Sequence, residues 1–538
     1  MTEIVMSQTP PILHGPSEKE KKYDRQLRLW AASGQAALES ANLLLVNSGS
    51  GVVGVETLKN LVLPGIGRFA IYDDAIVDDA DLGVNFFLDS DSLGKPRSEC
   101  LTELLVELNP EVQGAWYPKE GDATSLEALL ATSSVFTAIM YTFPITPERL
   151  SLLEAYGQQH KTPLVAIHSA GFYSYFRIHL PGAFPIVDTH PDETATTDLR
   201  LLTPWPELLE FARGMTENID SLDPYEHGHL PYVVILLHYL DAWRDSHGGS
   251  YPSTYKEKTE FRKIVQAAAR ADNTEGGEEN FDEAAAAVLK TVVPPSLPSG
   301  LREVFDYEPS EPLEERSSFW IIADAIKSFY AKHKALPLRG NVPDMKAQSK
   351  IYIQLQNIYK AKARQDAAEV LATAQAIVPD RQFEPAEVEL FCKNAPFVKL
   401  INATRGGNSA SVSRADRLRD VTAQEIANDE TADVTLMPLS LLPIYLALQS
   451  TAHVASASAD EILAEIVKVV PNANENERVL STAQEVARAE GGELHNVAAL
   501  TGGMVAQEMI KIITKQYIPI DNTCIFDGIA SRCQVLRL

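Results

Sequence analysis

Three glycines, Gly49, Gly51 and Gly54, follow a G-x-G-x-x-G spacing that could bind the phosphates of a nucleotide. Glycine permits a tight turn, a close approach of backbone N–H groups to phosphate, and close packing of the following helix on its strand. Asp73 stands where a Rossmann-type site has the acid that binds ribose hydroxyls. The same glycines could serve turn geometry and packing alone, so the motif leaves both interpretations open.

The flanking residues predict the elements that must position this motif. Residues 43–46 are an apolar run typical of a strand buried on both faces of a parallel sheet. Residues 52–61 predict a helix that ends before Pro64-Gly65, and residues 69–72 predict a second strand. The order strand, glycine turn, helix, strand is that of a nucleotide-binding unit.

Both chain ends contribute to the predicted α/β fold. Residues 133–141, 163–168 and 173–180 predict further strands that alternate with helices, which indicates a largely parallel sheet. Residues 495–515 predict an apolar helix with a start or kink at Gly502-Gly503, followed by short strands at 523–526 and 533–538. Because a single strand pair is not stable alone, we expect it to join the N-terminal sheet.

The stretch between these ends is mostly helical, with exposed loops rich in proline, glycine and asparagine. The predicted organisation is a flexible N-terminus at 1–19, a Rossmann-like domain in two parts at 20–180 and 481–538, and a large, mainly helical insertion at 181–480.

Composition narrows the class of function. The 538 residues carry a formal charge of −26, which argues against nucleic-acid binding and against docking on an anionic membrane. Four scattered cysteines without a C-x-x-C pair fit a reducing compartment. The N-terminus lacks the apolar core of a signal peptide, and the strongest apolar stretch, residues 230–240, is interrupted by His238. We expect a soluble intracellular protein, cytoplasmic and nuclear.

Two clusters of polar residues invite a functional interpretation. Glu226, His227 and His229 form an E-H-x-H group, but further metal ligands are not evident, so we expect a helix-entry loop and no metal site. Arg25 and Arg28 are three apart and would share one helix face, which is ordinarily solvated.

Four segments, taken in order, resemble one known family. They are YDRQLRLW, VETLKNLVLPGIG, LGKPRSE and the terminal TGGMVAQEMIKIITKQYIPIDNTCIFDG. Together they resemble the ubiquitin-like-modifier activating enzymes, most closely the regulatory, adenylation-inactive subunits of the heterodimeric enzymes that activate the neddylation modifier. The resemblance implies an α/β, Rossmann-like adenylation domain of the ThiF/MoeB type, with a helical insertion.

Active members of this family hold ATP and magnesium with a set of residues that this chain keeps only in part. The retained residues are Gly49, Gly51, Gly54, Asp73 and Lys95. A second acid is replaced by Ala75, and an Asn and an Arg are replaced by Asp81 and Val84. A second lysine is replaced by Arg97, and the later Asp has no counterpart in IMYTFPIT.

These losses remove the charges that adenylation needs. A modifier's C-terminal carboxylate attacks the α-phosphate of ATP, and cations and magnesium offset the developing charge. Val84 removes a cation and Asp81 adds an anion at that place. We therefore expect a vestigial site that binds no cofactor, with ATP and magnesium held by a partner subunit.

The resemblance also assigns roles to Arg25 and to the cysteines. In this family the Arg of the Y-x-R-Q segment contacts ATP phosphates held by the other protomer, so Arg25 is the expected arginine finger. The alternative is an ordinary surface or intrachain ion pair. Cys100, Cys392 and Cys524 are expected to be buried structural residues, and the nucleophilic cysteine is expected in the partner.

The sequence therefore predicts a regulatory subunit that is not an enzyme on its own. Its expected partners are the catalytic activating-enzyme subunit, the ubiquitin-like modifier and the conjugating enzyme. Two alternatives stay open: an autonomous homodimeric adenylating enzyme, and a non-catalytic adaptor of the ubiquitin-like pathway.

Overall fold

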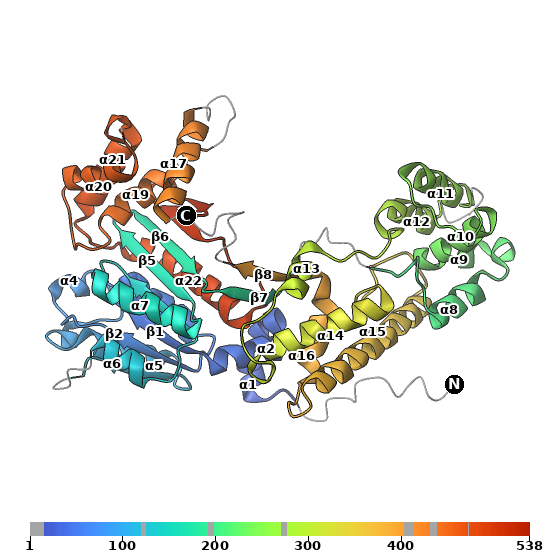
Figure 1. Ribbon diagram of the computed structural model, residues 1–538, viewed down its shortest axis with the longest axis horizontal. Coiled ribbons are helices and arrows are strands. Elements are labelled where there is room, and N and C mark those ends of the chain that lie inside the picture. Colours follow the sequence, from blue (N-terminus) through green and yellow to red (C-terminus); the bar gives the residue numbers. More distant parts are fainter. Residues whose placement is uncertain are drawn as a thin grey trace. The chain divides into compact units, whose positions relative to one another are not determined.

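The computed structural model describes residues 15–119, 125–191, 198–270, 277–402, 414–430, 438–471 and 473–538. The chain forms two compact units. One comprises Met1–Phe184 with Ile401–Leu538, and the other is Pro185–Leu400 (Figure 1).

The first unit is built on an eight-stranded sheet with the order β10-β9-β6-β5-β4-β1-β2-β3. The five strands from β5 to β3 in this order run parallel, and β6, β9 and β10 are added antiparallel. The strands are β1 Asn42–Val46, β2 Arg68–Tyr72, β3 Gln113–Tyr117, β4 Ala138–Thr142, β5 Leu164–Ala170, β6 Tyr173–His179, β9 Thr523–Asp527 and β10 Arg532–Leu536. Strand β9 pairs with β6 and β10 pairs with β9, so the predicted return of the chain to the N-terminal sheet is confirmed.

Helices cover this sheet on both faces, as expected for a mainly parallel sheet. The helices of the first unit are α1 Glu18–Lys22, α2 Asp24–Ser40, α3 Val52–Val62, α4 Asp79–Leu82, α5 Arg97–Leu108, α6 Leu126–Thr132, α7 Pro147–His160, α17 Arg414–Glu430, α19 Leu442–Ser450, α20 Ala459–Val469, α21 Glu477–Ala489 and α22 His495–Thr514. The predicted order β1, glycine turn, α3, β2 is confirmed.

Strand β3 was absent from the sequence prediction. Its residues, QGAWY, are exposed or half-buried because the strand lies at the sheet edge and pairs only with β2. An edge strand of this kind lacks the continuous apolar run by which the central strands were predicted.

The first unit includes residues 401–480, which the sequence analysis assigned to the insertion. Helices α19, α20 and α21 belong to the same hydrophobic core as β4, β5 and β6. Tyr445 of α19 illustrates the contact, because its ring packs edge-on against Tyr175 of β6 at 4.9 Å. Helical periodicity does not distinguish a helix that covers a sheet from one in a separate helical domain.

Helix α22 runs without a break through Gly502-Gly503, where a start or kink was predicted. A Cβ at Gly502 would lie 2.8 Å from the backbone nitrogen of Thr57, so this glycine lets α22 approach α3. By length and composition α22 could cross a membrane, whereas the sequence analysis took residues 230–240 as the best candidate and found no stretch long enough. However, 61% of the most apolar window of α22 is buried in the protein. The apolar character of α22 is that of a core helix.

The second unit is helical, apart from its part of a two-stranded sheet that was not predicted. The strands of this sheet are β7 Ala183–Val187 and β8 Val398–Asn402, whose residues 183–184 and 401–402 are counted in the first unit. Its helices are α8 Pro206–Thr216, α9 Pro224–His227, α10 Tyr232–Ser246, α11 Tyr255–Ala267, α12 Glu279–Thr291, α13 Ser299–Asp306, α14 Ser318–His333, α15 Ser349–Ile377 and α16 Pro385–Asn394. Two hydrophobic cores hold it together, one around α10 and α12 and one around α14 and α16.

Candidate functional site

The glycine turn between β1 and α3 is closed around the side chain of Asn47. Gly49 and Gly51 have φ angles of +60° and +64°, in the left-handed region that glycine adopts without strain. A Cβ at Gly51 would collide with the Asn47 amide, and one at Gly54 would lie 2.6 Å from its Oδ1. The glycines therefore make room for a side chain of the protein itself.

Asp73, the predicted ribose acid, is buried and fully engaged within the chain. Its Oδ2 accepts hydrogen bonds from Nε of Arg97 and Nδ2 of Asn47, both at 2.8 Å. Its Oδ1 accepts from Nη2 of Arg97 and from the backbone N–H of Ala75, both at 3.1 Å. Because a carboxylate offers about four lone-pair sites, a ribose hydroxyl would have to displace one of these donors.

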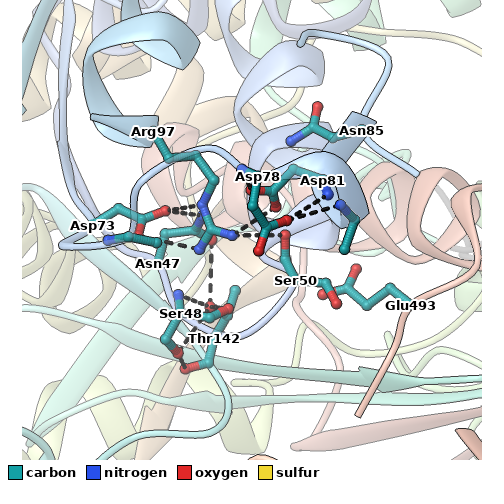
Figure 2. Close-up of polar contacts among 12 residues, drawn as sticks. Asn47, Ser48, Ser50, Asp73, Asp78, Asp81, Asn85, Arg97, Thr142 and Glu493 are labelled. Carbon is teal, nitrogen blue, oxygen red and sulfur yellow. Dashed lines mark hydrogen bonds and ion pairs between the residues drawn. The ribbon is translucent and has the colours of Figure 1, made fainter. Parts of the chain in front are cut away.

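Arg97 links Asp73 to Asp81 across the place expected for a nucleotide (Figure 2). Its side chain is only 4% exposed, and its Nη1 donates to Oδ1 of Asp81 at 3.0 Å. Burial acts to lower the pKa of Arg97, but the charges and hydrogen bonds of Asp73 and Asp81 outweigh it and raise the pKa above its usual value. The negative charge that Asp81 adds is thus offset by Arg97, whose side chain lies between the two carboxylates.

Glu493 lies at the N-terminus of α3, where a Rossmann-type site has phosphate. It precedes α22 in the chain, is 5% exposed, and accepts a hydrogen bond through Oε2 from the backbone N–H of Val53 at 2.8 Å. Burial raises the pKa of Glu493 to about 7, against the opposing effects of this N–H, of Arg97 and of the N–H groups of Val52 and Gly51. The chain supplies its own acidic group to this helix end.

Thr142 of strand β4 also fixes the glycine turn. It lies in the segment IMYTFPIT, which lacks the Asp expected in active members of the resembled family. The backbone N–H of Ser48 donates to Oγ1 of Thr142 at 2.8 Å, and the Ser48 hydroxyl donates to the Thr142 carbonyl at 2.9 Å (Figure 2). Thr142 therefore supports the backbone of the turn and offers no carboxylate.

The other predicted positions are not brought into this network. Lys95 is exposed and Val84 is half-buried. Asn85, next to Val84, is buried, and within the described part of the chain its Nδ2 has no hydrogen-bond partner. Of the predicted nucleotide residues, the three glycines and Asp73 come together, and Lys95 stays outside.

Sequence reasoning missed Asn47 and Glu493. Asn47 directly follows the β1 strand, a position at which a polar side chain reaches the carboxyl edge of the sheet. Glu493 is 440 positions from Val53 in the chain, and no local pattern connects the two.

Arg25 lies on the exposed side of the first turn of α2, and Tyr23 fixes the start of that helix. Tyr23 is 2% exposed, and its hydroxyl contacts Nδ2 of Asn109 at 3.2 Å. Arg25 makes no ion pair within the residues that the structure describes. Arg28, in contrast, pairs with Asp24 at 2.9 Å. Of the two arginines, Arg25 is available to a partner.

The cysteines named as structural are buried, as predicted. Cys100, Cys392 and Cys524 are buried and Cys533 is exposed. Burial raises the pKa of the Cys392 and Cys524 thiols to about 12, which opposes formation of the nucleophilic thiolate. In the E-H-x-H group, His227 is buried and bonded through Nδ1 to Glu278 at 2.8 Å.

Comparisons with known proteins agree with this architecture. The sequence model of the ThiF family matches residues 23–538, and the chain belongs to the ThiF family. The chain is similar to the NEDD8-activating enzyme E1 regulatory subunit of Xenopus laevis, at 34% identity over 97% of this chain and 99% of that protein.

Two further relatives carry similar names. The NEDD8-activating enzyme E1 regulatory subunit of Danio rerio is 34% identical over 97% of this chain and 99% of that protein. The NEDD8-activating enzyme E1 regulatory subunit AXR1 of Arabidopsis thaliana is 32% identical over 97% of each. The resemblance stated from the sequence and the Rossmann-like fold class are both confirmed.

Proposed function

We propose that this chain is the regulatory, adenylation-inactive subunit of a heterodimeric enzyme that activates the ubiquitin-like modifier of neddylation. The names of its relatives, similar over nearly the full length, support this class. The observation that carries the proposal is the filled site: Arg97 saturates Asp73, and Glu493 occupies the N-terminus of α3.

These contacts support an ATP site that lies only in the partner. A bound ATP would have to break the Arg97–Asp73 ion pair and expel the Glu493 carboxyl group, while Asp81 would remain buried close to the phosphates. Separating a buried ion pair costs several kcal/mol, of the order of 3–5. ATP and magnesium are therefore held by the catalytic subunit.

Arg25 contributes to that partner site in trans. Its guanidinium is permanently charged and forked, so it can bind two phosphate oxygens at once. The modifier's C-terminal carboxylate attacks the α-phosphate of ATP, forms an acyl adenylate and releases pyrophosphate, and Arg25 offsets the charge that develops.

The second half-reaction takes place on the partner. A cysteine of the catalytic subunit attacks the acyl adenylate, forms a thioester with the modifier and releases AMP. The high pKa of Cys392 and Cys524 supports this division of labour. The second unit of this chain, Pro185–Leu400, guides the modifier or the conjugating enzyme.

ATP–pyrophosphate exchange tests the proposal. We expect exchange with purified chain, modifier and candidate catalytic subunit together, and none when the catalytic subunit is left out. Exchange by this chain and modifier alone would instead identify an autonomous adenylating enzyme and overturn the proposal.

The role of Arg25 is tested separately with Arg25→Ala in the heterodimer and Arg28→Ala as the matched control. Loss of a charge-assisted hydrogen bond predicts exchange slower by about 10- to 100-fold for Arg25→Ala, with unchanged dimerisation. Wild-type exchange at both saturating and limiting ATP would favour the adaptor role. Imaging of the tagged full-length chain tests the proposed cytoplasmic and nuclear location.

A further inference from the structure

A cavity of about 310 Å³ lies in the second unit, between α15, α16 and the segment 338–342 that precedes α15. This size is at the lower end of small-molecule sites in proteins. All residues that line the cavity lie within Pro185–Leu400, and none of them belongs to the network around the glycine turn in the first unit.

Four cations line the cavity: Arg339, Lys360, Arg364 and Lys393. None of them forms an ion pair within the part of the chain that the structure describes, although the whole chain has a charge of −26. Lys360 and Arg364 are four residues apart on α15, a spacing at which like charges repel. Such a cluster is stabilised when an anion lies among its members.

Arg339 is the least exposed of the four and is held by two contacts. Its Nε donates to the backbone carbonyl of Lys393 at 3.0 Å, and its guanidinium lies over the ring of Phe397 at 4.8 Å. Burial lowers the pKa of Arg339, and no carboxylate opposes this effect. The two contacts fix the guanidinium while its Nη groups keep their hydrogen-bonding capacity for a ligand.

The acids near the cavity do not neutralise these cations. Asp366 is buried, accepts hydrogen bonds from the backbone N–H of Leu338 at 3.0 Å and pairs with Lys362 at 2.7 Å. Glu389 is the one acid among the lining residues, and it is exposed. The Cys392 thiol, whose pKa burial raises to about 12, stays uncharged.

The floor of the cavity is small and apolar. Ala363, Ala367 and Cys392 line it beside Leu338. Gly340 has a φ of +80°, and a Cβ there would lie 2.7 Å from the Cβ of Ala363, so glycine lets the 338–342 segment lie directly against α15. The buried residues of the lining are therefore apolar, whereas Lys360, Arg364 and Lys393 are exposed.

We propose that this cavity binds a phosphomonoester on a small apolar body. Phosphate carries up to two charges at pH 7 and three acceptor oxygens, which suits several separate cations better than a single carboxylate does. The apolar floor accommodates the body, and Arg339 is the residue that orients the phosphate. This proposal is independent of the adenylation chemistry.

Isothermal titration calorimetry of this chain with phenyl phosphate tests the proposal. Phenol and inorganic phosphate are titrated separately as controls, because each represents one part of phenyl phosphate. We expect saturable one-to-one binding of phenyl phosphate that is tighter than that of either part. Arg339→Gln should weaken binding about tenfold or more. Lys350→Gln is the matched control, because Lys350 is an exposed cation of α15 that does not line the cavity.

Lys360→Gln guards against misfolding of the Arg339 variant, because Lys360 is exposed and its replacement leaves the core intact. Absence of saturable binding, or an equal loss in Lys350→Gln, would overturn the proposal. So would tighter binding of an unphosphorylated acidic peptide than of phenyl phosphate. A phosphotyrosine peptide distinguishes the source: tighter binding than phenyl phosphate assigns a phosphorylated protein, and weaker binding assigns a free small molecule.

Discussion

Replacing Arg97 with methionine tests whether its buried ion pairs with Asp73 and Asp81 hold the glycine turn and the neighbouring strands together. The change removes the cation between Asp73 and Asp81, which are 1% and 7% exposed, and leaves two buried carboxylates without their partner. Breaking a buried pair from one side costs about 3–5 kcal/mol. We therefore expect the free energy of local opening around β1, α3 and β2 to fall by about that amount.

Hydrogen–deuterium exchange measures this opening directly, because the chain has two units and need not unfold in one step. Peptides that cover residues 42–73 should exchange at least about a hundredfold faster in Arg97→Met. Arg28→Met is the matched control: its partner Asp24 is exposed, so we expect a change under about 1 kcal/mol.

A triple variant separates charge from packing. Asp73→Asn and Asp81→Asn added to Arg97→Met remove the uncompensated charges, so more than half of the lost protection should return. Exchange in Arg97→Met no faster than in Arg28→Met would refute the argument that these ion pairs close the site.

Three further predictions follow from the same contacts. Burial raises the pKa of the Glu493 carboxyl group from 4.5 to about 7, so the folded state binds this proton more tightly than the unfolded state does. The free energy of unfolding should therefore fall by up to about 3 kcal/mol as pH rises from 4.5 through 7. Glu493→Gln should flatten this loss in urea unfolding measured between pH 5 and 8, and an unchanged pH profile would contradict the raised pKa. In the same urea unfolding experiment, Gly51→Ala should lower the free energy of unfolding by at least about 1 kcal/mol, because its left-handed φ and contact with Asn47 leave no room for a Cβ. Exposed Gly83→Ala, whose Cβ would meet only a carbonyl at 3.5 Å, should change it little. Iodoacetamide at pH 8 should label exposed Cys533 well before Cys392, because burial raises the pKa of the Cys392 thiol to about 12. Mass spectrometry of the labelled native chain measures the order, and earlier labelling of Cys392 would contradict the prediction.

Local pattern predicted the elements that carry strong local signals. The apolar run of β1, the glycine turn and the break at Pro64-Gly65 predicted β1, α3 and β2 within one or two residues. The same signals failed for β3, which is exposed at the sheet edge, and for the helices at 442–489, whose periodicity could not show that they cover the sheet. Periodicity reports that a face is buried, and it does not report against which element.

The sequence by itself determined the family, and the resemblance predicted a ribose-type acid at Asp73 and the loss of the Asn, the Arg and the second acid at Asp81, Val84 and Ala75. These are properties of residue types at fixed spacing, so they need no coordinates. Only the tertiary structure decided what fills the site. Arg97 reaches Asp73, at the end of β2, from the start of α5, and Glu493 reaches α3 from 440 positions away. Ion pairs and hydrogen bonds act over a few ångströms whatever the separation in sequence. Contacts between distant residues therefore form only where the folded chain brings those residues together.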